Sequence, residues 1–324
     1  MSLVLITGAT GFIGSQVVLQ TLEAGHNVHL VVRRPEQTDK LRQIFSKYDE
    51  RLSFVMLPDI TAPGGFDEAL QGVDYVIHVA SPIAGKGESD LLTPAVKGTV
   101  SVLESAMKVP SIRKVVITAS ILSIIPLTPP ADDAVVKEDN DFDFTFDAES
   151  PAALSPIGQY HASKIAAHKA VTDFVATKNP SFDVVTIHPV LVFGRSLIQE
   201  TAEELSGSNG MLFQTLMSET PFGKQFLGVH VSDVASAHVR ALTKSGTSIK
   251  GVQPYLVSSK ARPWREVHDF VKSQYPGLAI KLPQLDTLSY KVDTTRAQRE
   301  LGIEFRGMEM QVADLLDQQL ELRR

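Results

Sequence analysis

A tyrosine and a lysine four residues apart, Tyr160 and Lys164, are the pair in this sequence best suited to proton transfer. Positions i and i+4 of a helix lie on one face, so both side chains can act at one site. A free phenol has a pKa of about 10 and is a sluggish acid at neutral pH, and a nearby ammonium lowers that pKa. The pair therefore indicates general acid–base chemistry, although the same spacing also occurs by chance in surface Tyr–Lys pairs.

A serine, Ser120, supplies a hydroxyl at the expected end of a strand. Residues 114–120 form an apolar run that is typical of a buried parallel strand. Ligands of open α/β sheets bind beyond the carboxyl ends of the strands, so Ser120 is a candidate to hold a carbonyl oxygen. Ser123 lies three residues further on and is either a second functional hydroxyl or a loop residue.

Three glycines, Gly8, Gly11 and Gly14, follow an apolar run at residues 3–7, and a helical pattern begins directly after them. This order lets the backbone approach a dinucleotide pyrophosphate at the N-terminus of a helix. Glycines also serve ordinary turns, so the motif gains its weight from its position between a strand and a helix. It predicts a dinucleotide site.

Two arginines, Arg33 and Arg34, follow the strand predicted at residues 27–32. An NAD enzyme of this layout places an acid here for the ribose 2′-hydroxyl, whereas a guanidinium matches a 2′-phosphate. The position therefore predicts NADP(H), with Lys40 as a weaker second cation. The alternative is that these are solvated charges at a strand end.

Further strands are expected at residues 52–57 and 75–80, each followed by residues that suit a cofactor. Asp59 and Ile60 could contact adenine, or Asp59 could cap the next element, a helix expected through residues 66–70. Ala80 and Ser81 are small and would let the cofactor ribose lie close. His78, inside its apolar run, is interpreted as a satisfied core histidine.

The middle of the chain contains a helix expected from residue 90 to about 107 and another that opens at Tyr160. Between them, residues 126–159 form a long irregular segment rich in proline and acidic residues. Such a segment is either solvated or a wall of the substrate cleft.

The remaining elements complete an α/β fold, a Rossmann-type doubly wound parallel sheet with a smaller C-terminal substrate-binding lobe. Residues 1–194 plus 228–260 are assigned to the NADP-binding domain and residues 195–227 plus 261–324 to the lobe. These parts contain strands expected at 184–188, 228–230 and 255–258 and helices expected at 231–242, after Pro263, near 294–301 and at 310–322.

Composition excludes several classes of protein. The 324 residues are 43% hydrophobic and 21% charged, which is ordinary for a globular protein. A net charge of −6 argues against nucleic acid as a partner. The sequence contains no run of 18 apolar residues, so no membrane span is expected. The chain has no cysteine, and its nine histidines lack metal-ligand spacing, so no metal is expected. With the first strand starting at once, the expected location is cytoplasmic.

Taken in order, these motifs resemble an extended short-chain dehydrogenase/reductase. The resemblance is to the branch of dihydroflavonol-4-reductase-like enzymes and fungal NADPH-dependent aldehyde and ketone (methylglyoxal-type) reductases. It extends over nearly the whole chain, and the segments that carry it are residues 7–14, 32–33, 78–82, 90–96, 118–120, 160–164, 188–194, 231–238 and 292–297.

The resemblance implies that Ser120, Tyr160 and Lys164 form a catalytic triad and that the cofactor is NADP(H). Departures from the family occur at Ala119, where many relatives carry serine, and at the bulky Ile121 and Leu122, which bear on the size of the pocket. The cofactor contacts that it implies are Gly8, Thr10, Gly11, Phe12, Ile13, Arg33, Lys40, Asp59, Ile60, Ala80, Ser81, Thr118, Tyr160, Lys164, Pro189, Val190 and Val192.

The expected function is reduction of an aldehyde or ketone by NADPH, with Tyr160 as proton donor, Ser120 on the carbonyl oxygen and Lys164 lowering the Tyr160 pKa. The alternatives are a sugar-nucleotide epimerase or dehydratase, or a hydroxysteroid dehydrogenase, on the same fold. Arg33 argues against an NAD-retaining epimerase, and the apolar residues after Ser120 argue against a dehydratase. A non-catalytic NADP-binding redox sensor is a further alternative, and monomer and homodimer both fit.

Overall fold

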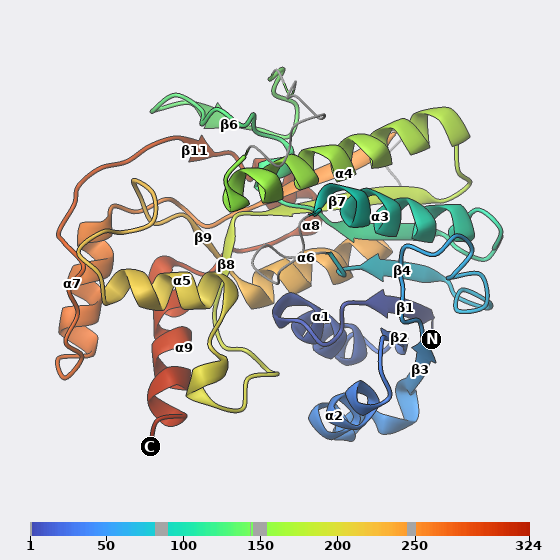
Figure 1. Cartoon of the computed structure of the whole chain (residues 1–324), viewed down its shortest axis with the longest axis horizontal. Helices are drawn as coiled ribbons and strands as arrows, with labels where there is room; N and C mark the ends of the chain where they lie inside the picture. Colours follow the sequence, from blue (N-terminus) through green and yellow to red (C-terminus); the bar gives the residue numbers. More distant parts are fainter. Residues whose placement is uncertain (1, 82–89, 143, 145–153, 245–250) are drawn as a thin grey trace.

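The computed structural model describes residues 2–81, 90–142, 144, 154–244 and 251–324 (Figure 1). Its centre is a parallel sheet with seven strands in the described ranges, in the order β10-β7-β5-β4-β1-β2-β3. The order reverses at β1, which confirms the doubly wound, Rossmann-type α/β prediction. The strands are β1 (Leu3–Thr7), β2 (Asn27–Val32), β3 (Leu52–Met56), β4 (Tyr75–His78), β5 (Lys114–Thr118), β7 (Asp183–Pro189) and β10 (Val252–Val257).

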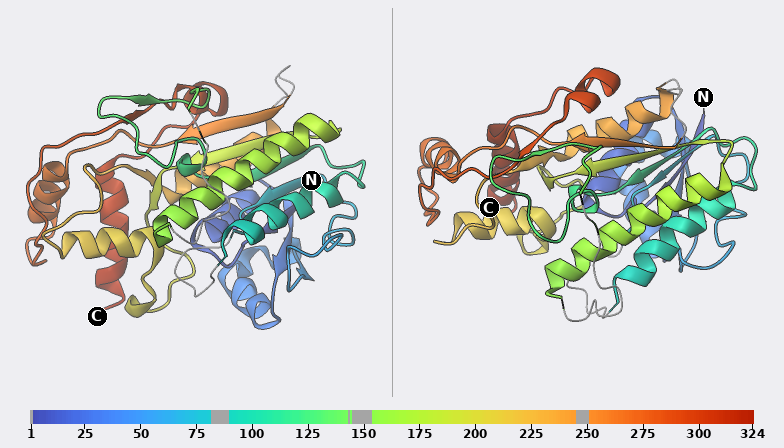
Figure 2. Two further views of the ribbon diagram at one scale, coloured as in Figure 1. Left: turned by 45° about the horizontal axis from the view of Figure 1, so that its top comes forward. Right: turned by 90° about the horizontal axis from the view of Figure 1, so that it is seen from above.

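Helices cover both faces of the sheet (Figures 1 and 2). Helices α1 (Phe12–Glu23) and α6 (Val231–Thr243) pack together on one face, and α3 (Leu92–Ala106) and α4 (Pro156–Lys178) pack together on the other. Strand β1 contributes Val4 and Ile6 to the first core and Leu5 to the second. Because both faces are covered, the strands are continuously apolar in sequence.

A third apolar core lies away from the sheet, at the left of Figure 1. It joins α5 (Gly207–Leu216), α7 (Trp264–Gln274) and α9 (Met308–Glu321) through buried side chains such as Leu212 and Leu315. This separate core supports the predicted lobe, whose boundaries stay a prediction. The other elements are α2 (Glu36–Ile44), α8 (Thr295–Leu301), the pairs β6 (Val135–Val136) with β11 (Lys291–Val292) and β8 (Leu191–Phe193) with β9 (Gly228–His230), and the 3₁₀ turns η1 (Ser46–Arg51), η2 (Ile121–Ser123) and η4 (Ala202–Glu204).

Three element predictions are wrong in detail. Residues 66–70 form turns rather than a helix, since Gly64 and Gly72 have positive φ and leave too few residues between them. Helix α4 begins at Pro156 rather than at Tyr160, so the tyrosine lies in its second turn. Strand β10 begins at Val252, three residues before the predicted start. Its first residues include a glutamine and a proline, which weaken the strand pattern but are tolerated at the sheet edge.

The acidic segment at 126–159 is only partly described. Residues 135–136 form β6, which pairs with β11, so this part is held against the C-terminal part of the chain. Residues 143 and 145–153 lie outside the described residues, as does Pro82 of the resemblance. No helix in the described ranges is long and apolar enough to span a bilayer.

Three histidines, two buried and one half-buried, make the stability of the fold sensitive to acid. Burial lowers the pKa of His78, His168 and His238 from 6.5 to about 4. Below pH 6.5 the unfolded chain binds protons at these imidazoles, whereas the folded chain does not until about pH 4, so the free energy of unfolding falls as the pH falls through this window.

We expect a loss on the order of 1–3 kcal/mol per histidine between neutral pH and about pH 4.5. Urea unfolding at several pH values, followed by the fluorescence of the single tryptophan, Trp264, measures it. A midpoint that does not change between pH 7 and about pH 5 would contradict this prediction.

Candidate active site

The turn between β1 and α1 requires glycine at two positions. Gly8 has a φ of +76°, and a Cβ there would lie 2.7 Å from the amide nitrogen of Ala80. The amide of Gly11 donates to the Gly8 carbonyl oxygen at 2.9 Å, which closes the turn. A Cβ on Gly14 would lie 1.9 Å from the same oxygen. Helix α1 can therefore begin against this turn only because residue 14 is glycine.

The N-terminus of α1 suits an anion. Gly11 is its N-cap, no described side chain caps the helix, and its first turn carries no acidic residue. The amides of Phe12 and Ile13 thus remain available, together with the positive end of the helix dipole. Since no Cβ at Gly8 or Gly11 stands in the way, the residues present fit the predicted pyrophosphate.

A cavity of about 360 Å³ lies at the β1–α1 turn and α2, on the side where the 2′-phosphate is predicted. Arg34 lines this cavity, whereas the predicted Arg33 does not. The Gln37 side chain accepts hydrogen bonds from the amides of both arginines, at 2.7 and 3.2 Å, and fixes the end of β2. Arg34 was predicted together with Arg33 as a match for the 2′-phosphate, although only Arg33 was named as a cofactor contact. Gln37 was not predicted, and its position after β2 was the available signal. The lining residues are Thr10, Arg34, Glu36, Gln37, Lys40, Leu41 and Ile198.

Asp59 follows β3 and closes a turn at Thr61, and the helix that it was expected to cap does not form. Its Oδ1 accepts from the amide and the hydroxyl of Thr61, at 2.8 and 2.6 Å. These two bonds, helped by the charge of Arg33, hold the pKa of the Asp59 carboxyl below its ordinary value. Ile60 is buried against Gly98 of α3. Contact of Asp59 and Ile60 with adenine stays a prediction.

The structure bonds the helix of Tyr160 and Lys164 to the turn that follows Ser120. His161, the residue after Tyr160, is buried, and its Nε2 shares a hydrogen bond with the Ile125 carbonyl oxygen at 3.0 Å. His161 was not predicted to have a role. The bond brings the two elements that carry the predicted triad together at the carboxyl ends of β4 and β5.

Ser120 is 9% exposed and lies two residues beyond the end of β5. Its Oγ accepts from the Leu122 amide at 3.2 Å, and its carbonyl oxygen accepts from the Ser123 hydroxyl at 2.5 Å. The ring of His188 bonds both this carbonyl oxygen and the Ser123 hydroxyl, at 3.1 and 2.9 Å. Ser123 is therefore a structural hydroxyl of this turn, which decides the alternative left open by the sequence.

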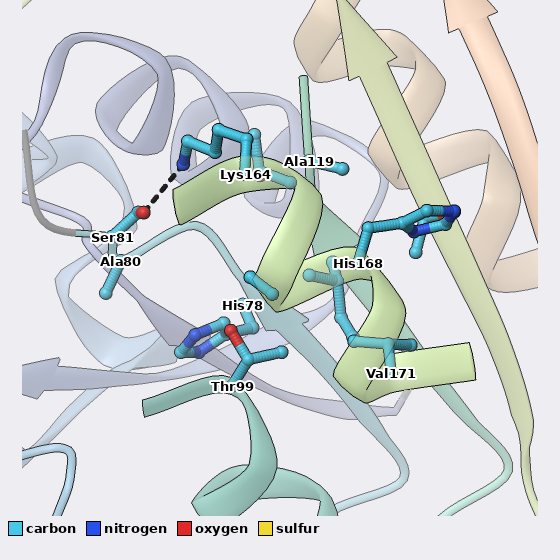
Figure 3. A pocket seen from close by; sticks show the side chains of 12 residues that line it. His78, Ala80, Ser81, Thr99, Ala119, Lys164, His168 and Val171 are labelled. Atoms are coloured by element: carbon cyan, nitrogen blue, oxygen red, sulfur yellow. Dashed lines mark hydrogen bonds between the residues drawn. The ribbon is translucent and has the colours of Figure 1, made fainter. Parts of the chain in front are cut away.

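Lys164 is buried and directed at β4 (Figure 3). Its Nζ donates to the Ser81 hydroxyl at 2.7 Å and lies 5.2 Å from the centre of the Tyr160 ring. Burial lowers the pKa of Lys164 to about 8 and raises the pKa of Tyr160 to about 12. The predicted lowering of the Tyr160 pKa is wrong for this state, because desolvation outweighs the ammonium, which is bound to Ser81. The phenol stays protonated at neutral pH.

A small cavity of about 20 Å³, room for about one water molecule, lies below Lys164. His78 lines it, with Nδ1 bonded to the Thr7 hydroxyl at 3.0 Å and Nε2 without a partner among the described residues. His78 is thus only half satisfied, which corrects its interpretation as a satisfied core histidine. Thr118 also lines this cavity, and its hydroxyl bonds His238 at 2.7 Å.

The residues predicted beside the nicotinamide lie where β7 ends. Pro189 is the last residue of β7, and the amide of Val190 donates to the Val257 carbonyl oxygen of β10 at 3.3 Å. The side chains of Val190 and Val192 are buried in the core under α1 and α6. Their contact with the cofactor, and that of Thr118 and Ala80, stays a prediction.

The chain is similar to one family model and to several known reductases. A family model described as the NAD dependent epimerase/dehydratase family matches residues 4–252. The ketoreductase sphI of Aspergillus fumigatus is 41% identical over 330 residues, which cover 98% of each chain. The structure of yeast methylglyoxal/isovaleraldehyde reductase Gre2 complexed with NADPH is 25% identical, with a TM-score of 0.85 over 99% of both chains. Vestitone reductase from alfalfa, at 24% identity and a TM-score of 0.80 over 99% of both chains, shares the fold.

These likenesses agree with the doubly wound sheet. The family match extends from β1 to β10, and the ketoreductase match extends over almost the whole chain. The chain belongs to the NAD dependent epimerase/dehydratase family of oxidoreductases, the extended short-chain dehydrogenases/reductases.

Proposed function

We propose that this chain is an NADPH-dependent carbonyl reductase that converts an aldehyde or a ketone into an alcohol, with Tyr160 as the proton donor. The observation that carries the proposal is the hydrogen bond of His161 to Ile125, which fixes the helix of Tyr160 and Lys164 against the turn of Ser120. The cofactor is proposed from the uncapped N-terminus of α1, the cations around the 360 Å³ cavity, and the NADPH in the Gre2 structure.

The chain's own residues would supply orientation and a proton. When bound, NADPH supplies a hydride for the carbonyl carbon. The Ser120 hydroxyl would hold the carbonyl oxygen, and Tyr160 would give that oxygen its proton. Because burial raises the pKa of Tyr160 to about 12, the phenol is in the protonated form that reduction needs.

A panel of aldehydes, diketones, β-ketoesters and flavanonols, assayed with NADPH and NADH side by side, tests this proposal. We expect turnover with NADPH and a preference over NADH of about 10- to 100-fold, the range for one or two hydrogen bonds to a charged group. Turnover of a UDP-sugar by protein that retains NAD would instead favour the epimerase alternative.

Replacing each arginine in turn identifies the phosphate ligand. Arg34→Ser should weaken NADPH binding about tenfold and leave NADH binding unchanged, because Arg34 lines the cavity. Arg33→Ser is the matched comparison, since Arg33 lies beside Asp59 instead. If NADH serves as well as NADPH across the panel, neither arginine has the proposed role.

A further inference from the structure

An ion pair joins α2 to the segment that follows β8, at the 360 Å³ cavity. Lys40 lines this cavity from α2, and its Nζ lies 2.8 Å from Oε1 of Glu200. Ile198, two residues before Glu200, lines the same cavity. The segment at residues 195–206 therefore contributes both a wall of the cavity and a carboxylate bound to one of its cations.

The rest of this segment is fixed in place, so the carboxylate stays near Lys40. On one side the Ser196 amide donates to Gln318 of α9, and the Gln318 amide donates back to the Ser196 carbonyl oxygen, both at 2.8 Å. On the other side the Glu204 carboxylate accepts from the Glu200 amide at 2.7 Å. The Glu200 backbone is thus anchored on α9 and η4, and its side chain reaches α2.

The proposed cofactor would bring a second anion to the same lysine. A phosphate monoester carries a charge of about −1.5 to −2 at neutral pH and presents three strong acceptor oxygens. The Lys40 and Glu200 side chains are 39% and 66% exposed, and an ion pair so open to water is weak. The phosphate can therefore displace the carboxylate from Lys40, and the anchored backbone then leaves Glu200 close to the phosphate, where like charges repel.

We propose that Glu200 competes with the 2′-phosphate for Lys40. This competition lowers the affinity of the protein for NADP(H) and leaves its affinity for NAD(H) unchanged. The inference rests on the proposed NADP(H) cofactor. A 2′-hydroxyl carries no charge and leaves the Lys40–Glu200 pair intact, so the competition acts on one cofactor only. The preference for NADP(H) over NAD(H) would thereby be smaller than Arg34 and Lys40, the cations at the cavity, would produce without Glu200.

Glu200→Gln tests this inference, because glutamine keeps the shape of the side chain and removes its charge. Calorimetric titration with NADPH and with NADH, at low salt and at about 0.3 M salt, gives the dissociation constants. We expect the NADPH Kd to fall about three- to tenfold at low salt, with less change at high salt, and the NADH Kd to stay within about twofold.

Glu203→Gln is the matched control. It removes the same charge from the neighbouring turn η4, where no ion pair of Glu203 is found among the described residues. In the double variant Lys40→Met/Glu200→Gln, the gain relative to Lys40→Met alone should be smaller than the gain in the parent protein, because the contested cation is absent and only the repulsion remains.

Three results would overturn the inference. An unchanged NADPH Kd in Glu200→Gln would show that Glu200 does not compete with the phosphate. An equal gain in NADPH affinity in Glu203→Gln would show that the effect comes from the net charge of the protein. Weaker NADPH binding in Glu200→Gln means that the pair holds the cavity wall in place instead. Failure of the proposed cofactor is distinct from these, since the unmodified protein would then not bind NADPH at all, and both proposals would be overturned.

Discussion

Tyr160→Phe is expected to lower kcat for carbonyl reduction by about 10²- to 10⁴-fold, the usual contribution of a general acid. Phenylalanine keeps the ring and removes only the hydroxyl that would protonate the carbonyl oxygen. The NADPH Kd should remain within about threefold, because the glycine turn, the N-terminus of α1 and the cations of the cavity are untouched.

The loss should be catalytic and not structural. The Tyr160 hydroxyl makes no hydrogen bond to the described residues that phenylalanine would break. The variant should therefore unfold at the urea concentration of the parent protein. Tyr48→Phe is a matched control, since Tyr48 lies in η1 and packs against Lys47 and Arg51, away from the site. Near-normal turnover in Tyr160→Phe would remove Tyr160 as the proton donor.

Gly14→Ala is expected to destabilise the protein by about 1–3 kcal/mol, the usual cost of overpacking a core. Helix propensity alone predicts the opposite, a gain of about 1 kcal/mol for alanine inside a helix. Steric contact decides the sign, because the new Cβ would lie 1.9 Å from the Gly8 carbonyl oxygen and 2.6 Å from its carbon. These are backbone atoms that cannot rotate away, so α1 must move off β1.

The same movement should weaken NADPH binding by about tenfold or more, since it displaces the amide donors at the start of α1. Urea unfolding and calorimetric titration with NADPH measure the two effects. Gly277→Ala is the control, because a Cβ there would meet no described atom within 4 Å and the φ of Gly277 is not positive. A Gly14→Ala protein as stable as the parent would show that the turn can relax.

The sequence alone predicts the local elements of the nucleotide-binding part well. The strands at residues 27–32 and 228–230 agree residue for residue with β2 and β9. Strand β2 is mostly apolar and ends where two arginines begin, so its C-terminal boundary is clear in the sequence. The glycine spacing likewise predicts the turn before α1, since the contact that requires glycine at residue 14 is made with Gly8, six residues earlier. The close approach of Ala80 to Gly8 is, in contrast, a tertiary contact. Where the pattern was weak, at residues 66–70 and at the start of β10, the prediction failed.

The sequence also predicts, from the types and order of Ser120, Tyr160 and Lys164, which residues carry the candidate chemistry, and this assignment stays a prediction. It did not determine their electrostatics. The sign of the Tyr160 pKa shift depends on how deeply α4 buries the phenol and on where Lys164 points. The burial of the phenol and the direction of the Lys164 side chain result from packing, and the i, i+4 spacing of the two residues predicts neither.

Only the tertiary structure decided the contacts between distant parts of the chain. Ser81 with Lys164, Ile125 with His161, and Lys40 with Glu200 are pairs whose members lie far apart in sequence. No local pattern predicts such pairs, because each forms only after separate elements have packed at the same edge of the sheet. The sequence by itself therefore determined the fold class and named the candidate reactive groups, and the packing of the sheet and lobe decided which groups meet.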